Sequence, residues 1–179
     1  MIIIGIDPGT NITGYGVIKF SGNNLKRIDS GIIRLPSSKS IHTRLEIIYD
    51  QLYKLLKKYK PDEFAIETAF YGKNVQSAMK IGYARGVSIL AAVHNGINVS
   101  EYSPREVKKS VVGKGAASKQ QVNYMIKNIL GLPDTKMKSD ESDALAIAIC
   151  HAFRLKRTKS VKNDWKTFIE AFPERVISY

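Results

Sequence analysis

Hydrophobic and polar residues follow two different periods along the chain, and each period predicts a different kind of element. Short apolar runs bounded by turn residues are typical of strands. Pro8-Gly9 and Gly14 indicate the first connection between such runs, and Ser21-Gly22-Asn23-Asn24 indicates the second. The second connection is short, which favours an antiparallel hairpin. The predicted strands are Ile2–Asp7, Tyr15–Phe20, Leu25–Arg34, Glu63–Glu67 and Ile97–Tyr102.

Apolar residues at helical spacing predict a helix wherever consecutive strands are far apart in the sequence. The first of these helices stops before Pro61 and the second before Gly96. Ser103 and Ser118 each open a capping box, and Ser139 is a candidate cap of the last helix. The predicted helices cover Ile41–Tyr59, Val75–His94, the two segments that follow Ser103 and Ser118, and an apolar segment over Ala144–Phe153.

The order of these elements predicts an α/β fold. The first three strands form an antiparallel meander, and the helices before the last two strands imply parallel crossovers. The expected architecture is a mixed five-stranded sheet flanked by helices, formed by residues 1–155. Residues 156–179 form a basic C-terminal tail with partial order, which could contact DNA or protein or fold back onto the core.

The composition and net charge indicate which kind of partner this fold could bind. The 179 residues suit one domain, 44% of them are hydrophobic, and the formal net charge is +12. A folded domain this basic suits a polyanionic partner such as nucleic acid, although the charge could serve solubility alone. No apolar stretch approaches the ~20 residues of a membrane-spanning helix. With the single cysteine Cys150 and no secretory signal at the start, we expect a cytoplasmic protein.

Four acidic residues occupy positions where the predicted fold could gather them. Asp7 and Glu67 each end an apolar strand, where ordinary solvation does not explain a carboxylate. Asp140 and Asp143 are three residues apart at the start of the last helix, so they share one face. Such oxygen donors suit Mg²⁺ or Mn²⁺, and two ions could activate a water and stabilise the leaving oxygen of a phosphodiester. Individually, Asp140 and Asp143 could be helix N-terminal acids, and Asp7 a turn residue.

The histidines do not favour zinc. His151 follows Asp143 by eight residues, about 12 Å along a helix, which is too far to share its metal. His42 and His94 lie in unrelated segments, so structural or surface roles are expected for all three. Cys150 lies within an apolar helix and is expected to be a small core residue.

An ordered set of motifs resembles the RuvC family of Holliday-junction resolvases. It begins with Asp7-Pro8-Gly9-Thr10, Gly14-Tyr15-Gly16-Val17 and Ala65-Ile66-Glu67. It continues with Ala84-Arg85-Gly86-Val87, Pro104-Arg105-Glu106-Val107-Lys108, Val111-Val112-Gly113-Lys114-Gly115 and Asp140-Glu141-Ser142-Asp143-Ala144-Leu145-Ala146. The set covers roughly residues 2–153 in the family's order.

The resemblance implies an RNase H-like fold and a homodimer that makes paired symmetric nicks in a four-way DNA junction, in recombination and repair. It implies Asp7, Glu67, Asp140 and Asp143 as the metal-binding catalytic residues. The implied cofactor is Mg²⁺, or Mn²⁺ in its place, with two ions per active site. A branch-migration complex is the implied partner, and the location is the cytoplasm, in association with the nucleoid.

The resemblance also implies DNA contacts. Phe70 matches an aromatic residue that stacks at the junction centre, and Tyr71 and Lys73 lie in the same segment; Phe70 could instead pack under its loop. Lys108 and Lys119 match basic residues implicated in DNA contact, within a segment that also holds Arg105 and Lys114. Such a basic run is more often a solvated face, but beside a metal site it suits phosphates. Small residues Gly82, Ala84 and Gly86 could let their helix pack closely against its twin or against the sheet.

Two other functions are weighed against a nuclease. The segment Gly5-Ile6-Asp7-Pro8-Gly9-Thr10 also resembles the first phosphate loop of actin-like ATPases and sugar kinases. Those enzymes need a second lobe and a second Gly-rich loop, for which this chain is too short. A non-catalytic junction-binding scaffold would keep the basic surface and the dimer, but it would not need four placed carboxylates.

Overall fold

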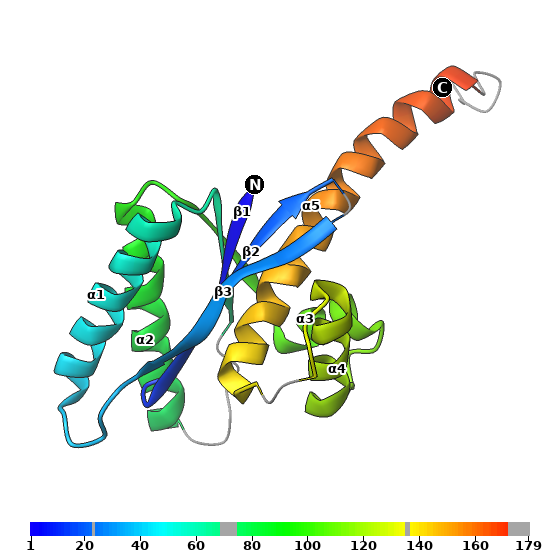
Figure 1. Cartoon of the computed structure of the whole chain (residues 1–179). Helices are drawn as coiled ribbons and strands as arrows, with labels where there is room; N and C mark the ends of the chain where they lie inside the picture. The colour runs from blue at the N-terminus through cyan, green and yellow to red at the C-terminus, as the bar shows by residue number, and fades with distance from the viewer. Residues whose placement is uncertain (23, 69–74, 135–136, 172–179) are drawn as a thin grey trace.

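The computed structural model describes residues 1–22, 24–68, 75–134 and 137–171, with side chains described as far as Lys156. Five strands form one sheet in the order β3-β2-β1-β4-β5 (Figure 1). β1, β2 and β3 are antiparallel neighbours, whereas β4 pairs parallel to β1 and β5 pairs parallel to β4. The predicted mixed sheet is therefore confirmed. The strands are β1 Ile2–Asp7, β2 Ile12–Ser21, β3 Asn24–Arg34, β4 Glu63–Glu67 and β5 Asn98–Tyr102.

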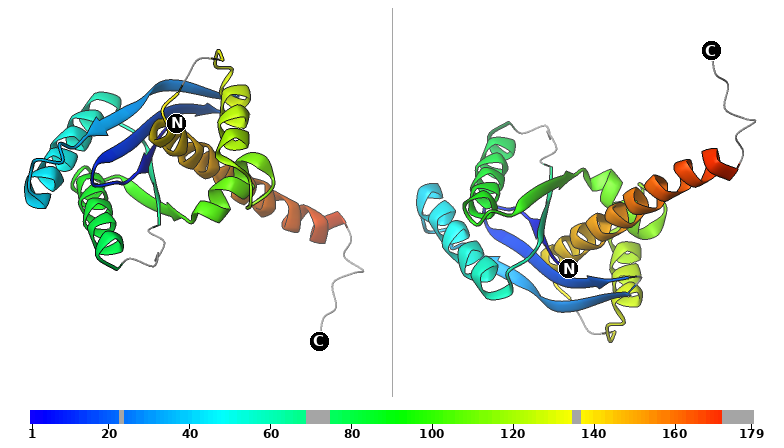
Figure 2. Two further views of the ribbon diagram at one scale, coloured as in Figure 1. Left: turned by 90° about the horizontal axis from the view of Figure 1, so that it is seen from below. Right: turned by 90° about the horizontal axis from the view of Figure 1, so that it is seen from above.

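Helices cover both faces of the sheet (Figures 1 and 2). The two faces differ because successive strand residues point to opposite sides. Ile3 packs in the hydrophobic cluster on the α5 side, whereas Ile4 and Ile6 pack in the cluster on the α1 and α2 side. α1 Ile41–Tyr59 and α2 Val75–His94 lie on one face, and α3 Pro104–Val112, α4 Lys119–Leu130 and α5 Ser139–Ala171 lie on the other.

Glycines let α5 lie directly on the backbone of β1 and β2. A Cβ atom at Gly5 would come within 2.3 Å of the Ala144 carbonyl oxygen. A Cβ atom at Gly14 would come within 2.0 Å of the Asp140 carbonyl oxygen. Real Cβ atoms do not approach oxygen this closely, so only glycine permits this packing.

The structure corrects two predictions of local structure. Gly14 lies inside β2 and is not a turn residue. A glycine is required there because the backbone of α5 lies against this position. Ser139 is the first residue of α5 and not its cap; the backbone N–H of Ser142 donates to the carbonyl of Lys138, one residue earlier. The capping boxes at Ser103 and Ser118 are confirmed, each with both reciprocal hydrogen bonds.

The last helix is longer than its apolar segment predicts. α5 continues from Phe153 to Ala171, and its far end projects away from the sheet (Figures 1 and 2). Neither Gly nor Pro occurs between Ser139 and Ala171, so nothing in the sequence interrupts the helical backbone. The division between residues 1–155 and 156–179 falls inside this helix and stays a prediction. Among the described residues, no helix is long and apolar enough to span a membrane.

Candidate metal and nucleic-acid site

Two of the candidate carboxylates lie at the same edge of the sheet. β1 and β4 are parallel neighbours with Ile6 opposite Ile66, so Asp7 and Glu67 end adjacent strands in the same direction. Alternation along each strand gives these side chains the same face as Ile3 and Ala65, which pack on the α5 side. Both carboxylates therefore face the layer that contains α5.

The first turn of α5 lies over this edge. Asp7 pairs with Gly14 across the antiparallel ladder, and Gly14 lies against the backbone of Asp140. One turn further, Ala144 lies against Gly5, two residues before Asp7 on β1. The strand register and two glycine contacts thus bring the helix that carries Asp140 and Asp143 to the end of β1.

The carboxylates affect one another's protonation. Burial, with the charges of Asp143 and Asp140, raises the pKa of Asp7 to about 7 against the opposing effect of Lys119. Burial, together with the charges of Asp7 and Asp143, likewise raises the pKa of Glu67 to about 7. Four acidic groups in a partly desolvated space repel one another, so this edge of the sheet favours a compensating cation.

Lys119, the first residue of α4, is one source of positive charge at this site. Its ammonium lies 3.3 Å from Asp143 Oδ2 and donates to Ser139 Oγ at 3.0 Å. Its charge lowers the pKa of both Asp7 and Glu67, whereas the charge of Lys108 on α3 lowers the pKa of Glu67 alone. Lys119, which the resemblance implicates in DNA contact, thus lies beside the carboxylates, and its contact with DNA stays a prediction.

Two hydrogen bonds that the sequence did not predict hold the first turn of α5. Ser30 Oγ on β3 donates to Glu141 Oε1 at 2.7 Å. Asn123 Nδ2 on α4 donates to Ser142 Oγ at 3.2 Å. Glu141 and Ser142 lie between Asp140 and Asp143, so these bonds fix the turn that presents both carboxylates. Ser30 and Glu141 are 111 residues apart, and no local pattern in the sequence connects them.

The donor set fits a hard divalent cation in type and charge. The four candidates offer only carboxylate oxygens, which suit Mg²⁺ or Mn²⁺ and not zinc. Among the described residues, no three His, Cys, Asp or Glu side chains are already arranged to hold a metal ion. The Asp143 carboxylate is instead engaged by Lys119 and Ser139. The fit of this site to a divalent cation thus rests on the carboxylate oxygens as ligands and on the repulsion among the four carboxylates.

His151 has a structural environment, as its spacing from Asp143 predicted. It is 3% exposed, and its Nδ1 lies 2.7 Å from the Tyr102 hydroxyl. Burial, with a smaller effect of Arg154, lowers the pKa of His151 to about 4, although the Glu63 carboxylate lies 3.5 Å from its Nε2. Removal from water therefore outweighs attraction to that carboxylate. Cys150 is buried, as predicted.

The predicted DNA-contact residues lie on the layer of α3 and α4. Arg105 is exposed on α3, and its side chain packs over Gly115. Lys108 is half-buried on the same helix, and Lys114 is exposed just after α3 ends. Of these residues, Lys108 and Lys119 lie near enough to Glu67 for their charges to lower its pKa. Phe70, Tyr71 and Lys73 lie outside the described residues, so their roles stay predictions.

The shifted pKa values predict how the stability of the metal-free protein changes with pH. Asp7 and Glu67 have folded-state pKa values above their unfolded values, so their penalty is present above pH 7 and is relieved as pH falls. His151 acts in the opposite direction as pH falls through 6.5, its unfolded-state pKa. Between pH 8 and 6.5 the relief at the two carboxylates outweighs the onset of this His151 effect. We expect the free energy of unfolding to rise by about 1 kcal/mol over that interval, since both groups stay partly accessible.

Urea denaturation in EDTA at pH 8 and 6.5 measures this effect. Saturating Mg²⁺ should flatten the profile, because a bound cation removes the repulsion. A metal-free protein that loses stability as pH falls from 8 to 6.5 would contradict the shared repulsion of Asp7 and Glu67.

Comparisons with known proteins agree with the resemblance seen in the sequence. The family model described as crossover junction endodeoxyribonuclease RuvC matches residues 3–151. The protein of that name from Pelotomaculum thermopropionicum is 45% identical over 152 residues, or 85% of this chain and 93% of its own. The one from Chloroherpeton thalassium is 44% identical over 185 residues, or 99% of this chain and 100% of its own. A solved T. thermophilus RuvC in complex with Holliday junction substrate has a TM-score of 0.84 at 31% identity, covering 88% of this chain and 96% of that one.

Proposed function

This chain belongs to the RuvC family of crossover junction endodeoxyribonucleases, and on that premise we propose that it resolves four-way DNA junctions by paired symmetric nicks. It is a metal-dependent hydrolase with an RNase H-like fold, acting in recombination and repair. The proposal extends to Mg²⁺, or Mn²⁺ in its place, with two ions per active site. The same relatives match both the nuclease core and, in one case, nearly the whole chain.

One observation carries the assignment to this edge of the sheet. The first turn of α5 lies on Gly14, directly opposite Asp7 in the ladder, and both Asp7 and Glu67 have pKa values raised to about 7. A scaffold that only binds DNA has no use for a repulsive acidic cluster beneath basic helices. A metal-dependent nuclease does, because cations and the substrate phosphate meet there.

In the proposed reaction, Asp7, Glu67, Asp140 and Asp143 hold the divalent ions. When bound, such ions activate water and stabilise the charge that develops on a leaving oxygen. Attack by water on phosphorus breaks the bond to the 3′ oxygen and leaves a 5′-phosphate. The hydrogen bonds from Ser30 and Asn123 to the first turn of α5 restrict the positions of Asp140 and Asp143, which favours a fixed geometry.

We propose that the basic residues beside the carboxylates contact the DNA backbone. Arg105, Lys108, Lys114 and Lys119 belong to α3, α4 and the segment between them, on the same face as the carboxylates. Their charges suit phosphates on either side of the cleaved bond. Phe70, Tyr71 and Lys73 follow Glu67 closely in the sequence, and a stacking role at the junction centre is proposed for Phe70.

An apolar stripe on α2 supports the proposed homodimer. Its five large side chains are 45–69% exposed in the single chain, and they recur at intervals of three, four and seven residues. Gly82 and Gly86 share this face, with no atom within 4 Å of a Cβ placed at either position. A twin helix could therefore approach closely. The stripe consists of Val75, Met79, Tyr83, Leu90 and Val93.

Leu90→Glu is expected to dissociate this dimer. A carboxylate buried without a partner at an apolar interface should raise the dimer dissociation constant at least about 100-fold. Tyr124→Glu is the matched control, since Tyr124 is 67% exposed on α4, away from the stripe. Sedimentation equilibrium measures both. If the Leu90 variant stays dimeric while wild type is dimeric, the subunits meet at another surface.

Two features of the cellular setting are proposed from the family. A motor that moves the junction would supply substrate to a resolvase, so a branch-migration complex is the proposed partner. DNA as the substrate and one cysteine in the chain suit the cytoplasm and its nucleoid.

The decisive experiment compares a labelled four-way junction with a linear duplex of matching sequence, each with Mg²⁺ and with EDTA. We expect paired nicks at symmetric positions, confined to the junction and dependent on Mg²⁺. Nicking of linear duplex at an equal rate would refute the substrate assignment. Binding without cleavage under Mg²⁺ and Mn²⁺ would favour the junction-binding scaffold.

A further inference from the structure

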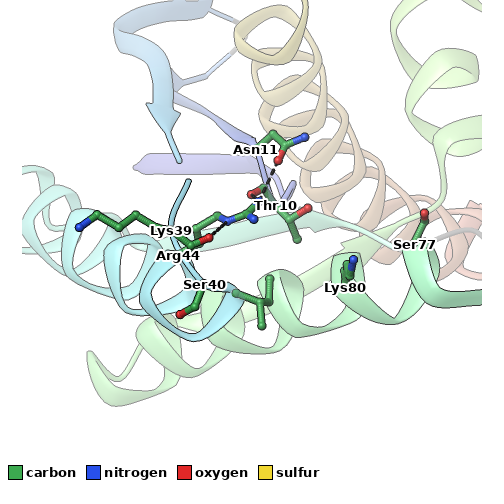
Figure 3. Close-up of a pocket in the computed structure, with 8 residues that line it drawn as sticks. Thr10, Asn11, Lys39, Ser40, Arg44, Ser77 and Lys80 are labelled. Atoms are coloured by element: carbon green, nitrogen blue, oxygen red, sulfur yellow. Dashed lines mark hydrogen bonds between the residues drawn. The ribbon is translucent and has the colours of Figure 1, made fainter. Parts of the chain in front are cut away.

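A second basic site lies on the other side of the sheet edge from the carboxylates. A cavity of about 470 Å³ opens where the N-terminal ends of α1 and α2 meet the loop after β1 (Figure 3). Figure 3 shows Ser77 and Lys80 on α2 across from Ser40 and Arg44 at the start of α1. None of the residues that line it is acidic.

Arg44 gives this cavity a fixed positive wall. Its guanidinium donates to the Thr10 carbonyl at 3.1 Å, to Asn11 Oδ1 at 2.9 Å and to the Lys39 carbonyl at 3.0 Å. These acceptors are neutral, so the bonds hold the side chain without cancelling its charge. The same bonds fix the loop that follows Asp7.

Lys39 and Lys80 add charge that is also uncompensated. Neither forms an ion pair with a carboxylate among the residues described by the structure. The first turns of α1 and α2 contain no acidic residue, unlike those of α3 and α5. Both helix dipoles therefore add to the positive potential at the cavity, and no acidic residue in those two first turns offsets it.

The loop connects the cavity closely to the carboxylates. Thr10, in the cavity wall, follows Asp7 by three residues, which span at most about 10 Å. That length corresponds to about three nucleotides along one strand of DNA. A strand whose phosphate lies at Asp7 can therefore place a phosphate up to about three nucleotides away at the Thr10 wall of the cavity.

We propose that this cavity is a phosphate subsite, separate from the α3 and α4 basic face, for the DNA strand that passes the active site. Lys39 and Lys80 bind the phosphate, and Arg44 holds the Thr10 loop and adds its charge. This inference rests on the proposed function, since it takes the substrate to be DNA. Its chemistry would also accept a free phosphate ion, which the test must separate.

The test uses the full-length protein with the double variant Lys39→Ala/Lys80→Ala. Lys54→Ala/Lys57→Ala is the matched control, because it removes the same charge from the exposed far end of α1. Junction binding is measured in EDTA between 50 and 200 mM salt. We expect the cavity variant to bind about tenfold more weakly, with a salt slope reduced by about one to two, and the control to match wild type.

The outcomes separate the subsite from the proposed function. Wild type that nicks junctions, while the cavity variant keeps the wild-type affinity and slope, would refute the subsite alone. Wild type that neither binds nor nicks junctions would refute the proposed function. Inorganic phosphate is tested by its effect on thermal unfolding. Stabilisation of wild type but not of the cavity variant, with an unchanged DNA slope, would overturn the DNA assignment in favour of a free anion.

Discussion

Asp7→Asn is expected to reduce junction cleavage by about 10³-fold or more while leaving junction binding intact. Asparagine keeps the size of aspartate but removes the negative charge that we propose holds a divalent ion. A loss of about 4 kcal/mol in transition-state stabilisation corresponds to that factor. Cleavage is measured on a labelled junction with Mg²⁺ under single-turnover conditions, and binding is measured in EDTA.

The same substitution is expected to stabilise the metal-free protein. Burial and the charges of Asp143 and Asp140 raise the pKa of Asp7 to about 7, so at pH 8 an unfavourable charge is present in the fold. Removing it should increase the free energy of unfolding by about 1 to 2 kcal/mol, discounted for partial exposure. A variant that loses activity because it misfolds would show the opposite sign.

Asp50→Asn is the matched control, because Asp50 is exposed on α1 and its loss changes the net charge equally. It should leave cleavage, binding and metal-free stability unchanged. If Asp7→Asn still nicks junctions at the wild-type rate, Asp7 does not hold a required ion and the active site has been placed incorrectly.

The sheet-edge carboxylates were predictable because two local rules converge. An apolar strand predicts where its last residue lies, and parallel neighbours bring their carboxyl ends to one edge. Asp7 and Glu67 therefore follow from the strand pattern alone. The spacing of Asp140 and Asp143 predicts that they share a helix face, but not which strand that face meets. Register and the close approach of Gly14 to Asp140 decide that, and neither is visible in a periodicity.

Glycine shows most clearly where sequence patterns mislead. Glycine is typical of turns, so the sequence places Gly14 in the connection before the second strand. Only the contact of Gly14 with α5 explains why a glycine lies inside β2. The hydrogen bond from Ser30 to Glu141 is hidden for a related reason, since it joins segments far apart in the chain. The three bonds of Arg44 to the Thr10 loop and to the Lys39 carbonyl organise a cavity, and no local pattern in the sequence indicates them.

Lys119→Ala is expected to slow junction cleavage by about 10²-fold at saturating protein. The Lys119 ammonium lies 3.3 Å from Asp143 Oδ2, and its charge acts on both Asp7 and Glu67. The side chain is 72% exposed, so it can turn toward a phosphate that enters the site. A cation in this position would stabilise the negative charge that develops during hydrolysis.

Two measurements separate this role from simple DNA binding. Lys109→Ala is the control, since Lys109 is exposed on α3 and its substitution removes the same charge. If Lys119 acts on the reaction, its loss lowers the single-turnover rate at saturation, whereas a binding role would change only the dissociation constant. Lys119→Ala should leave the Mg²⁺ concentration needed for half-maximal rate no higher than in wild type, because it removes a cation beside Asp143. Asp143→Asn, which removes a proposed metal ligand, should increase that concentration. A normal rate at saturation, with weakened binding alone, would limit Lys119 to holding the DNA.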